Sequence, residues 1–104
     1  MARQAVSAFI PSCDATISES VSATSAGSIH TIGKNRLFAI NATQDITIAF
    51  GNSTGVAASA TSSSFRIPSG ASIQWDTGTA YDQFQVFNLG ASSASVYAIL
   101  LSVM

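Results

Sequence analysis

The side chains that could take part in chemistry are few in this chain. His30 is the only histidine and Cys13 the only cysteine, so the chain offers no second His or Cys to complete a zinc site and no pair for an internal disulfide. His30 stands between Ile29 and Thr31, in a segment with the composition of a strand, and we expect it to have a structural role. For Cys13 we expect a small, buried, apolar side chain.

The carboxylates and serines form no catalytic motif. Asp76 and Asp82 flank Gly78 and Tyr81, and such a pair could in principle act as the two carboxylates of a glycosidase or as oxygen ligands of calcium. Their spacing matches neither pattern, and aspartates that form turns are expected instead. A serine nucleophile would have only His30 as its base. We therefore predict no enzyme, no catalytic residue, no metal and no cofactor.

Three neighbouring side chains suggest a different kind of site. Trp75 and Tyr81 could form a platform on which sugar rings stack, with Asp82 as its polar anchor. A role in the core or at a subunit interface is expected more often for such aromatics. The alternative that this platform supports is a carbohydrate-binding module or receptor-binding tip.

Composition excludes several partners. Charged residues make up 9% of the 104 residues, with a net charge of −1, and hydrophobic residues make up 47%. A nucleic-acid binder needs several cations on one face, so neither DNA nor RNA is an expected partner. The sequence has no run of eighteen apolar residues, and the segment after Arg3 lacks the apolar stretch of a signal peptide. We expect no membrane partner and synthesis in the cytoplasm.

Apolar residues alternate with a period of two along most of the chain, and short Gly-, Pro-, Asn- and Ser-containing segments separate the alternating runs. This pattern predicts an all-β fold, a single-domain β-sandwich or jelly roll of eight or nine short strands over residues 1–104. The expected strands are residues 5–10, 15–24, 29–32, 36–42, 45–50, 65–67, 71–75, 83–89 and 93–103. Residues 56–61 are expected to form either a weak strand or an exposed flap.

Several local features are expected from particular residues. Pro11 should end the first strand because it lacks an N–H for the ladder. Glu19 interrupts the row of apolar residues on one face of the second strand, which indicates either a bulge or two short strands in its place. Residues 41–44 should form a hairpin loop between the strands at 36–42 and 45–50, and Pro68 and Gly70 should form a turn.

The last strand is apolar on both faces. Val96, Ala98 and Leu100 lie on one face, and the other carries Tyr97, Ile99, Leu101 and Val103. Burying a large apolar side chain fully contributes about 1.5–3 kcal/mol, so a second face left in water would forgo about 6–12 kcal/mol. A small domain has one core to offer, and we therefore predict that Tyr97, Ile99, Leu101 and Val103 form a subunit interface in a homo-oligomer.

The C-terminal part of the chain resembles the small β-sandwich virion proteins of tailed bacteriophages. The similarity is carried by the turn Ile67-Pro68-Ser69-Gly70 before a strand, by Tyr81-Asp82 at the start of the next strand, and by Ser93-Ala94-Ser95 before an apolar last strand. It implies a capsid decoration (cement) protein, or a small tail or neck component, that stabilises a shell. The implied partners are further copies of the chain, often as a trimer, and the major capsid protein or another virion protein. The implied location is the virion.

Overall fold

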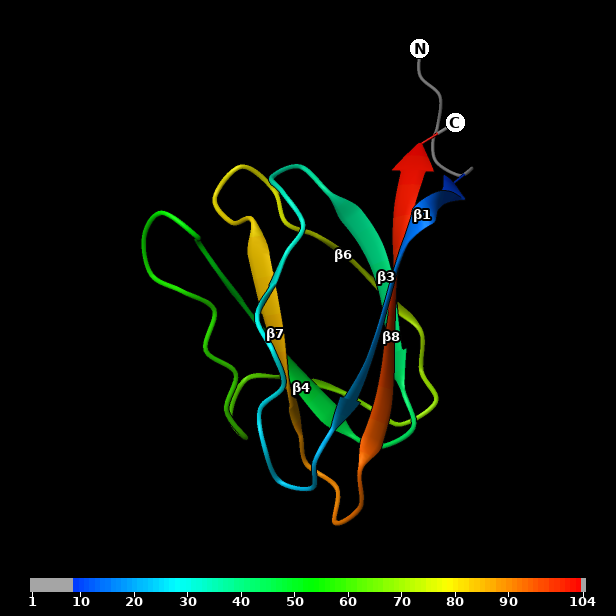
Figure 1. Ribbon diagram of the computed structural model, residues 1–104, viewed down its shortest axis with the longest axis vertical. Helices are drawn as coiled ribbons and strands as arrows, with labels where there is room; N and C mark the ends of the chain where they lie inside the picture. The colour runs from blue at the N-terminus through cyan, green and yellow to red at the C-terminus, as the bar shows by residue number, and fades with distance from the viewer. Residues whose placement is uncertain (1–8, 104) are drawn as a thin grey trace.

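The computed structural model describes the backbone of residues 9–103 and the side chains of residues 16–101 (Figure 1). This part of the chain contains eight strands and no helix, which confirms the predicted all-β class. The strands are β1 (Phe9–Val21), β2 (His30–Thr31), β3 (Leu37–Ala42), β4 (Ile46–Gly51), β5 (Phe65–Ile67), β6 (Ile73–Asp76), β7 (Gln83–Asn88) and β8 (Ala94–Val103).

The strands form two antiparallel sheets of four, packed face to face. The first sheet has the order β1-β8-β3-β6 and the second has the order β2-β7-β4-β5. Strand β1 therefore pairs with β8, β2 with β7, β3 with β6 and β4 with β5. This order results when one long antiparallel ribbon is wound into a sandwich, and it is the topology of a jelly roll.

The core lies between the sheets because each strand turns its alternate, apolar side chains inward. Phe38 of β3 stacks on Phe84 of β7, with 4.9 Å between ring centroids. Both rings are almost completely buried. Ile40 and Val86 are also fully buried in this cluster. The sandwich therefore has a core that both sheets supply.

Different chemistry closes the two long sides of the sandwich. On one side, Glu19 of β1 points inward and its carboxylate lies 2.8 Å from His30 Nε2 of β2. On the other side, Trp75 of β6 packs against Phe65 of β5, with ring centroids 5.8 Å apart. An ionisable pair thus joins the sheets at β1 and β2, and an aromatic pair joins them at β5 and β6.

The predicted hairpin between residues 36–42 and 45–50 is wrong. β3 belongs to the first sheet and β4 to the second, so the chain crosses from one sheet to the other between them. Each strand has one strongly apolar face. In adjacent strands of one sheet these faces would lie side by side, whereas the crossing lets them face each other across the core.

The first two predicted strands are one strand. β1 continues through Pro11, which is paired with Leu101 of β8, and the irregularity lies between Pro11 and Thr16 rather than at Glu19. Proline is tolerated because β1 is an edge strand, where the missing N–H removes no ladder bond on the open side. The part of the first predicted strand at residues 5–8 lies outside the described residues.

The chain between β4 and β5, residues 52–64, lies along the outer face of the second sheet and is called the strap here. It is the green segment on the left of Figure 1. Ala58 N–H donates to Gln83 Oε1 (3.2 Å), Ala60 N–H donates to Gln85 Oε1 (2.8 Å), and both alanines are buried. A Cβ on Gly51 would lie 2.0 Å from the nitrogen of Ala58, so only glycine at position 51 allows the strap to pass this close to β4. Residues 56–61 are therefore a covering segment rather than a strand.

One buried amide joins three parts of the fold. The side chain of Asn88 is completely buried at the end of β7. Its Nδ2 donates to the carbonyls of Val21 (3.1 Å), Ser22 (3.2 Å) and Ser92 (2.8 Å), and its Oδ1 accepts from Gly90 N–H (2.8 Å). The end of β1 and the β7–β8 connection are thus held to the same side chain.

Candidate functional site

The outward face of the first sheet carries an apolar stripe. It is built by residues that alternate with the buried ones in the two central strands, β3 and β8. The register places Leu37 beside Leu101 and Ala39 beside Ile99. The side chains of this outer stripe are Leu37, Ala39, Tyr97, Ile99 and Leu101.

The three predicted interface residues with described side chains face away from the core. Tyr97 is 41% exposed, and Ile99 and Leu101 are half-buried by their neighbours within the sheet. Val103 belongs to β8, but its side chain lies outside the described residues. Because Ile99 and Leu101 are partly covered already, the gain from covering the stripe is smaller than the sequence alone suggests.

Polar residues border the outer stripe on both sides. Ser18 of β1 lies opposite Tyr97, and Gln74 of β6 lies next to Ala39. Both border residues are exposed. An apolar centre within a polar rim is the usual arrangement of a protein contact surface.

A second feature is a cluster of four aromatic rings at the β5–β6 side of the sandwich: Phe50, Phe65, Trp75 and Tyr81. Phe50 lies at its centre, with its ring centroid 5.5 Å from that of Trp75 and 5.9 Å from that of Tyr81. The sequence-predicted platform residues Trp75 and Tyr81 are therefore brought to one ring. Trp75 is half-buried, and its Nε1 is buried with no hydrogen-bond partner among the described residues.

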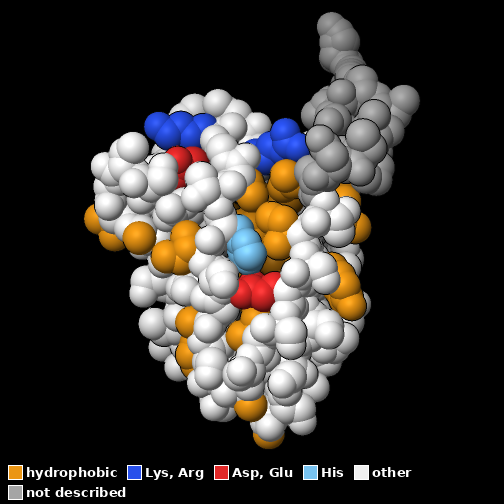
Figure 2. Space-filling view, viewed as in Figure 1, with side chains coloured by type: hydrophobic (Ala, Val, Ile, Leu, Met, Phe, Trp, Pro, Cys, Tyr) orange, Lys and Arg blue, Asp and Glu red, His pale blue; other side chains and the backbone are white. Residues whose placement is uncertain are grey.

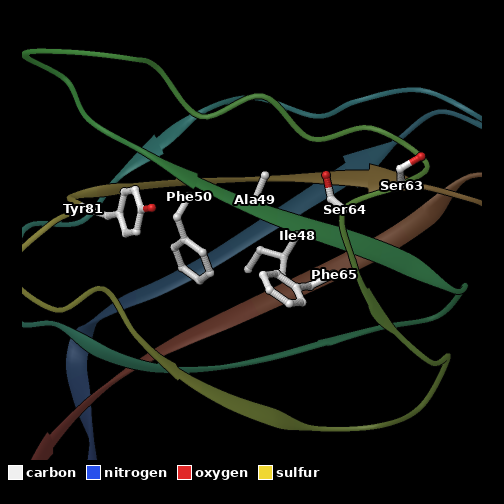
Figure 3. A pocket seen from close by; sticks show the side chains of 7 residues that line it. All are labelled: Ile48, Ala49, Phe50, Ser63, Ser64, Phe65 and Tyr81. Carbon is white, nitrogen blue, oxygen red and sulfur yellow. The ribbon is translucent and has the colours of Figure 1, made fainter.

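A cleft of about 340 Å³ opens beside this cluster (Figure 3). Tyr81 and Phe65 lie on either side of Phe50, and two serine hydroxyls lie along one rim. Tyr81 is 43% exposed and Phe65 is 67% exposed. The residues that line the cleft are Ile48, Ala49, Phe50, Ser63, Ser64, Phe65 and Tyr81, none of them charged.

Asp82, the predicted polar anchor of the platform, is engaged elsewhere. Its carboxylate accepts from Ser53 N–H (2.9 Å) and from Ser53 Oγ (2.6 Å). The hydroxyl of Ser53, followed by its main-chain N–H, holds the pKa of Asp82 below its ordinary value. The carboxylate thus ties the strap to the start of β7, and it does not belong to the cleft lining.

A second carboxylate fixes the β5 end of the same sheet. Asp45 accepts from Ser69 N–H (2.8 Å) and from the Arg66 guanidinium. The Ser69 N–H, followed by Arg66, lowers the pKa of Asp45. Because both partners lie in or next to β5, this carboxylate stabilises the position of the edge strand.

His30 has a defined partner. Its Nε2 contacts Glu19, which also accepts from Ser28 N–H. The ring lies 5.2 Å from that of Phe84. Figure 2 shows the histidine at the centre of one face with an acidic side chain beside it. Within residues 16–101 there is no group of three or more potential metal ligands. The side chain of Cys13 lies outside the described residues.

Comparison with protein-family models, curated proteins and solved structures found no match for this chain. The resemblance to virion proteins of bacteriophages therefore stays a prediction. No helix in the described part of the chain has the length and hydropathy needed to span a membrane.

Sequence reasoning missed part of both surfaces. Leu37 and Ala39 belong to the outer stripe only because β3 pairs with β8. Phe50 and Phe65 come to the aromatic cluster from β4 and β5, and neither was predicted to lie at a surface. The exposure of Phe65 could have been expected, because the residue lies between a serine-rich segment and Arg66, and polar neighbours on both sides make its complete burial difficult.

Proposed function

We propose that this protein is a non-enzymatic structural subunit that assembles with further copies of itself through the outer stripe. The observation that carries the proposal is the difference between the two outer faces. The strap covers the second sheet, whereas no segment within residues 9–103 covers the apolar centre of the first. A neighbouring subunit would supply that cover.

The burial of the outer stripe limits the strength of a single contact. Covering what remains exposed of Tyr97, Ile99 and Leu101 contributes about 2 kcal/mol per subunit, by scaling full burial to the exposed part. Association of two free proteins costs at least about 4 kcal/mol, which these three side chains on both subunits together only offset, so Leu37, Ala39 and the polar rim must supply the net affinity. The contact is therefore weak between two free subunits. It becomes stronger where many copies are held together, because each contact that forms raises the effective concentration for the next one.

A repeating shell is the setting in which such a contact works best. We propose that the protein is a virion component, a capsid decoration protein bound to the major capsid protein. The resemblance of residues 65–98 supports this setting. The jelly-roll topology also supports it, by fold-level analogy alone, because viral capsid domains commonly use that fold. The low charge of the chain suits a subunit that stays in an assembly.

Sedimentation velocity on the purified chain tests the proposal. We expect the sedimentation coefficient to rise with concentration up to about 1 mM, as weak association requires. Tyr97→Asp, which places a charge on the most exposed side chain of the stripe, should abolish the rise. Val56→Asp is the matched control, because Val56 is 84% exposed on the strap. The proposal would be contradicted if the wild-type protein stayed monomeric at every concentration. It would also be contradicted if Tyr97→Asp left the rise of the sedimentation coefficient unchanged.

A saccharide-binding function is the second candidate, supported by the exposed Tyr81 ring beside the cleft. Its support is weaker because Asp82, the expected polar anchor, is hydrogen-bonded to Ser53, and because the Trp75 Nε1 is buried and so cannot reach a sugar. Titration with simple sugars, followed by the fluorescence of Trp75, tests it. A spectrum that no sugar changes would leave this candidate without support.

A further inference from the structure

The second sheet has an incomplete edge. β5 pairs with β4 only from Ile46 to Ile48, and its first residue, Phe65, lies opposite Ile48. β4 continues to Gly51, but the chain before β5 turns away, with Ser64 N–H donating to the carbonyl of Thr61 (3.1 Å). Within residues 9–103, no strand lies beside the last part of β4 on this side, and the cleft occupies that place.

The direction of the main chain at this edge follows from the ladder. Asp45 and Gly51 both use their carbonyls on the β7 side, where they accept from Leu89 N–H (2.9 Å) and Asp82 N–H (3.1 Å). Successive residues of a strand direct their main-chain groups to opposite sides. The N–H and C=O of Phe50 therefore point to the side that β5 has left open.

The cleft selects against charge. No residue that lines it is charged. The nearby Asp45 and Arg66 form an ion pair, and Asp82 is bonded to Ser53. A charged group entering the cleft would lose water without gaining a partner, which is costly. A large uncharged apolar side chain would instead pack against the exposed rings of Phe65 and Tyr81.

We propose that this cleft binds an extended segment of another protein, which pairs with the main chain of Phe50 and inserts one uncharged apolar side chain between Phe65 and Tyr81. Addition of a strand to an open sheet edge uses main-chain bonds for affinity and a side-chain pocket for specificity. The inference rests on the proposed function, in which a structural subunit must also hold a partner other than itself. It places that contact on the second sheet, away from the outer stripe.

The test is an NMR titration of the ¹⁵N-labelled full chain with capped pentapeptides, Ac-Thr-Ser-Xaa-Ser-Thr-NH₂. With Phe or Leu at Xaa, we expect the amide signals of Ala49, Phe50, Phe65 and Tyr81 to shift, with a dissociation constant of about 1 mM. With Lys at Xaa, we expect no shift. Phe65→Ser and Tyr81→Ser should each weaken binding about tenfold, and Val56→Ser should not.

Main-chain pairing has its own readout. The residue opposite Phe50 directs its N–H toward β4, and the residue before it directs its N–H away. N-methylation of the central residue should therefore weaken binding about tenfold, whereas N-methylation of the preceding serine should have little effect. Equal effects of the two modifications would refute strand addition.

Three further results would overturn the proposal: no shift with any peptide up to about 10 mM, an equal response to the Lys peptide, or stronger shifts with N-acetylglucosamine or methyl glucoside. The last result would assign the cleft to a saccharide. Failure of self-assembly is seen separately, because Tyr97→Asp changes sedimentation and leaves the cleft intact.

Discussion

Replacement of Asn88 by alanine is expected to cost the fold more than any comparable polar substitution. The side chain forms four hydrogen bonds with main-chain groups, three through Nδ2 and one through Oδ1. The Val21 carbonyl is in a buried environment, so leaving it unpaired costs about 1–3 kcal/mol. The other three groups are partly buried and can regain water, at about 1 kcal/mol each. The expected loss is about 4–6 kcal/mol, a large fraction of the stability of a small domain.

Equilibrium unfolding in urea, followed by the fluorescence of Trp75, measures this loss directly. Gln74→Ala is the control, because it removes an exposed amide from an edge strand and should change stability by less than about 0.5 kcal/mol. Asn88→Asp keeps the acceptor for Gly90 N–H but places a carboxylate against three carbonyl oxygens, and it should be at least as destabilising as alanine. A loss below about 1 kcal/mol for Asn88→Ala would refute the argument that this amide holds the two sheets together.

Three other substitutions test separate parts of the structure. Gly51→Ala should displace the strap, because its Cβ would overlap the main chain of Ala58; faster proteolytic cleavage within residues 52–64 is expected, and an unchanged rate would contradict the contact. Glu19→Ala should lower the free energy of unfolding by about 2 kcal/mol, since two partners lose a charged acceptor at a partly exposed site; a neutral result by urea unfolding would count against this lock. Asp45→Asn tests stability in acid. Because the pKa of Asp45 is lowered in the folded state, its ionised form stabilises the fold above the unfolded-state pKa of about 4. This contribution is lost as the pH falls through the folded-state pKa. Urea midpoints at about pH 6 and pH 3 should therefore differ less in Asp45→Asn than in the wild type, and an identical difference would argue against the hydrogen bonds assigned to Asp45.

The sequence predicted the fold class because the period of two extends over most of the chain and is local information. The inward faces of β3, β7 and β8 follow from it, as does the turn at Pro68, where Ala71 N–H donates to the Pro68 carbonyl (3.1 Å) and Gly70 has a φ of 81°. The sequence failed where strand partners matter. A short loop after β3 predicts a hairpin, but β3 pairs with β6 and β8 whereas β4 pairs with β5 and β7, so partners distant in the sequence place the two strands in different sheets.

The candidate surfaces divide in the same way. Alternation alone places Tyr97, Ile99 and Leu101 on the outer side of the last strand. It does not say how much of each side chain the neighbouring strands cover, and that coverage reduces the expected energy of the contact. The cleft had no local signal, because its residues come from β4, β5, the strap and the segment before β7.

The sequence by itself determined that this protein is an all-β sandwich with one strand apolar on both faces, because side-chain direction in a strand depends only on position along the chain. The tertiary structure decided which outer face is left uncovered, where the edge of β4 opens, and which buried polar groups meet, such as Glu19 with His30. These features arise from contacts between segments far apart in the sequence, and they are fixed only when the ribbon is wound into two sheets.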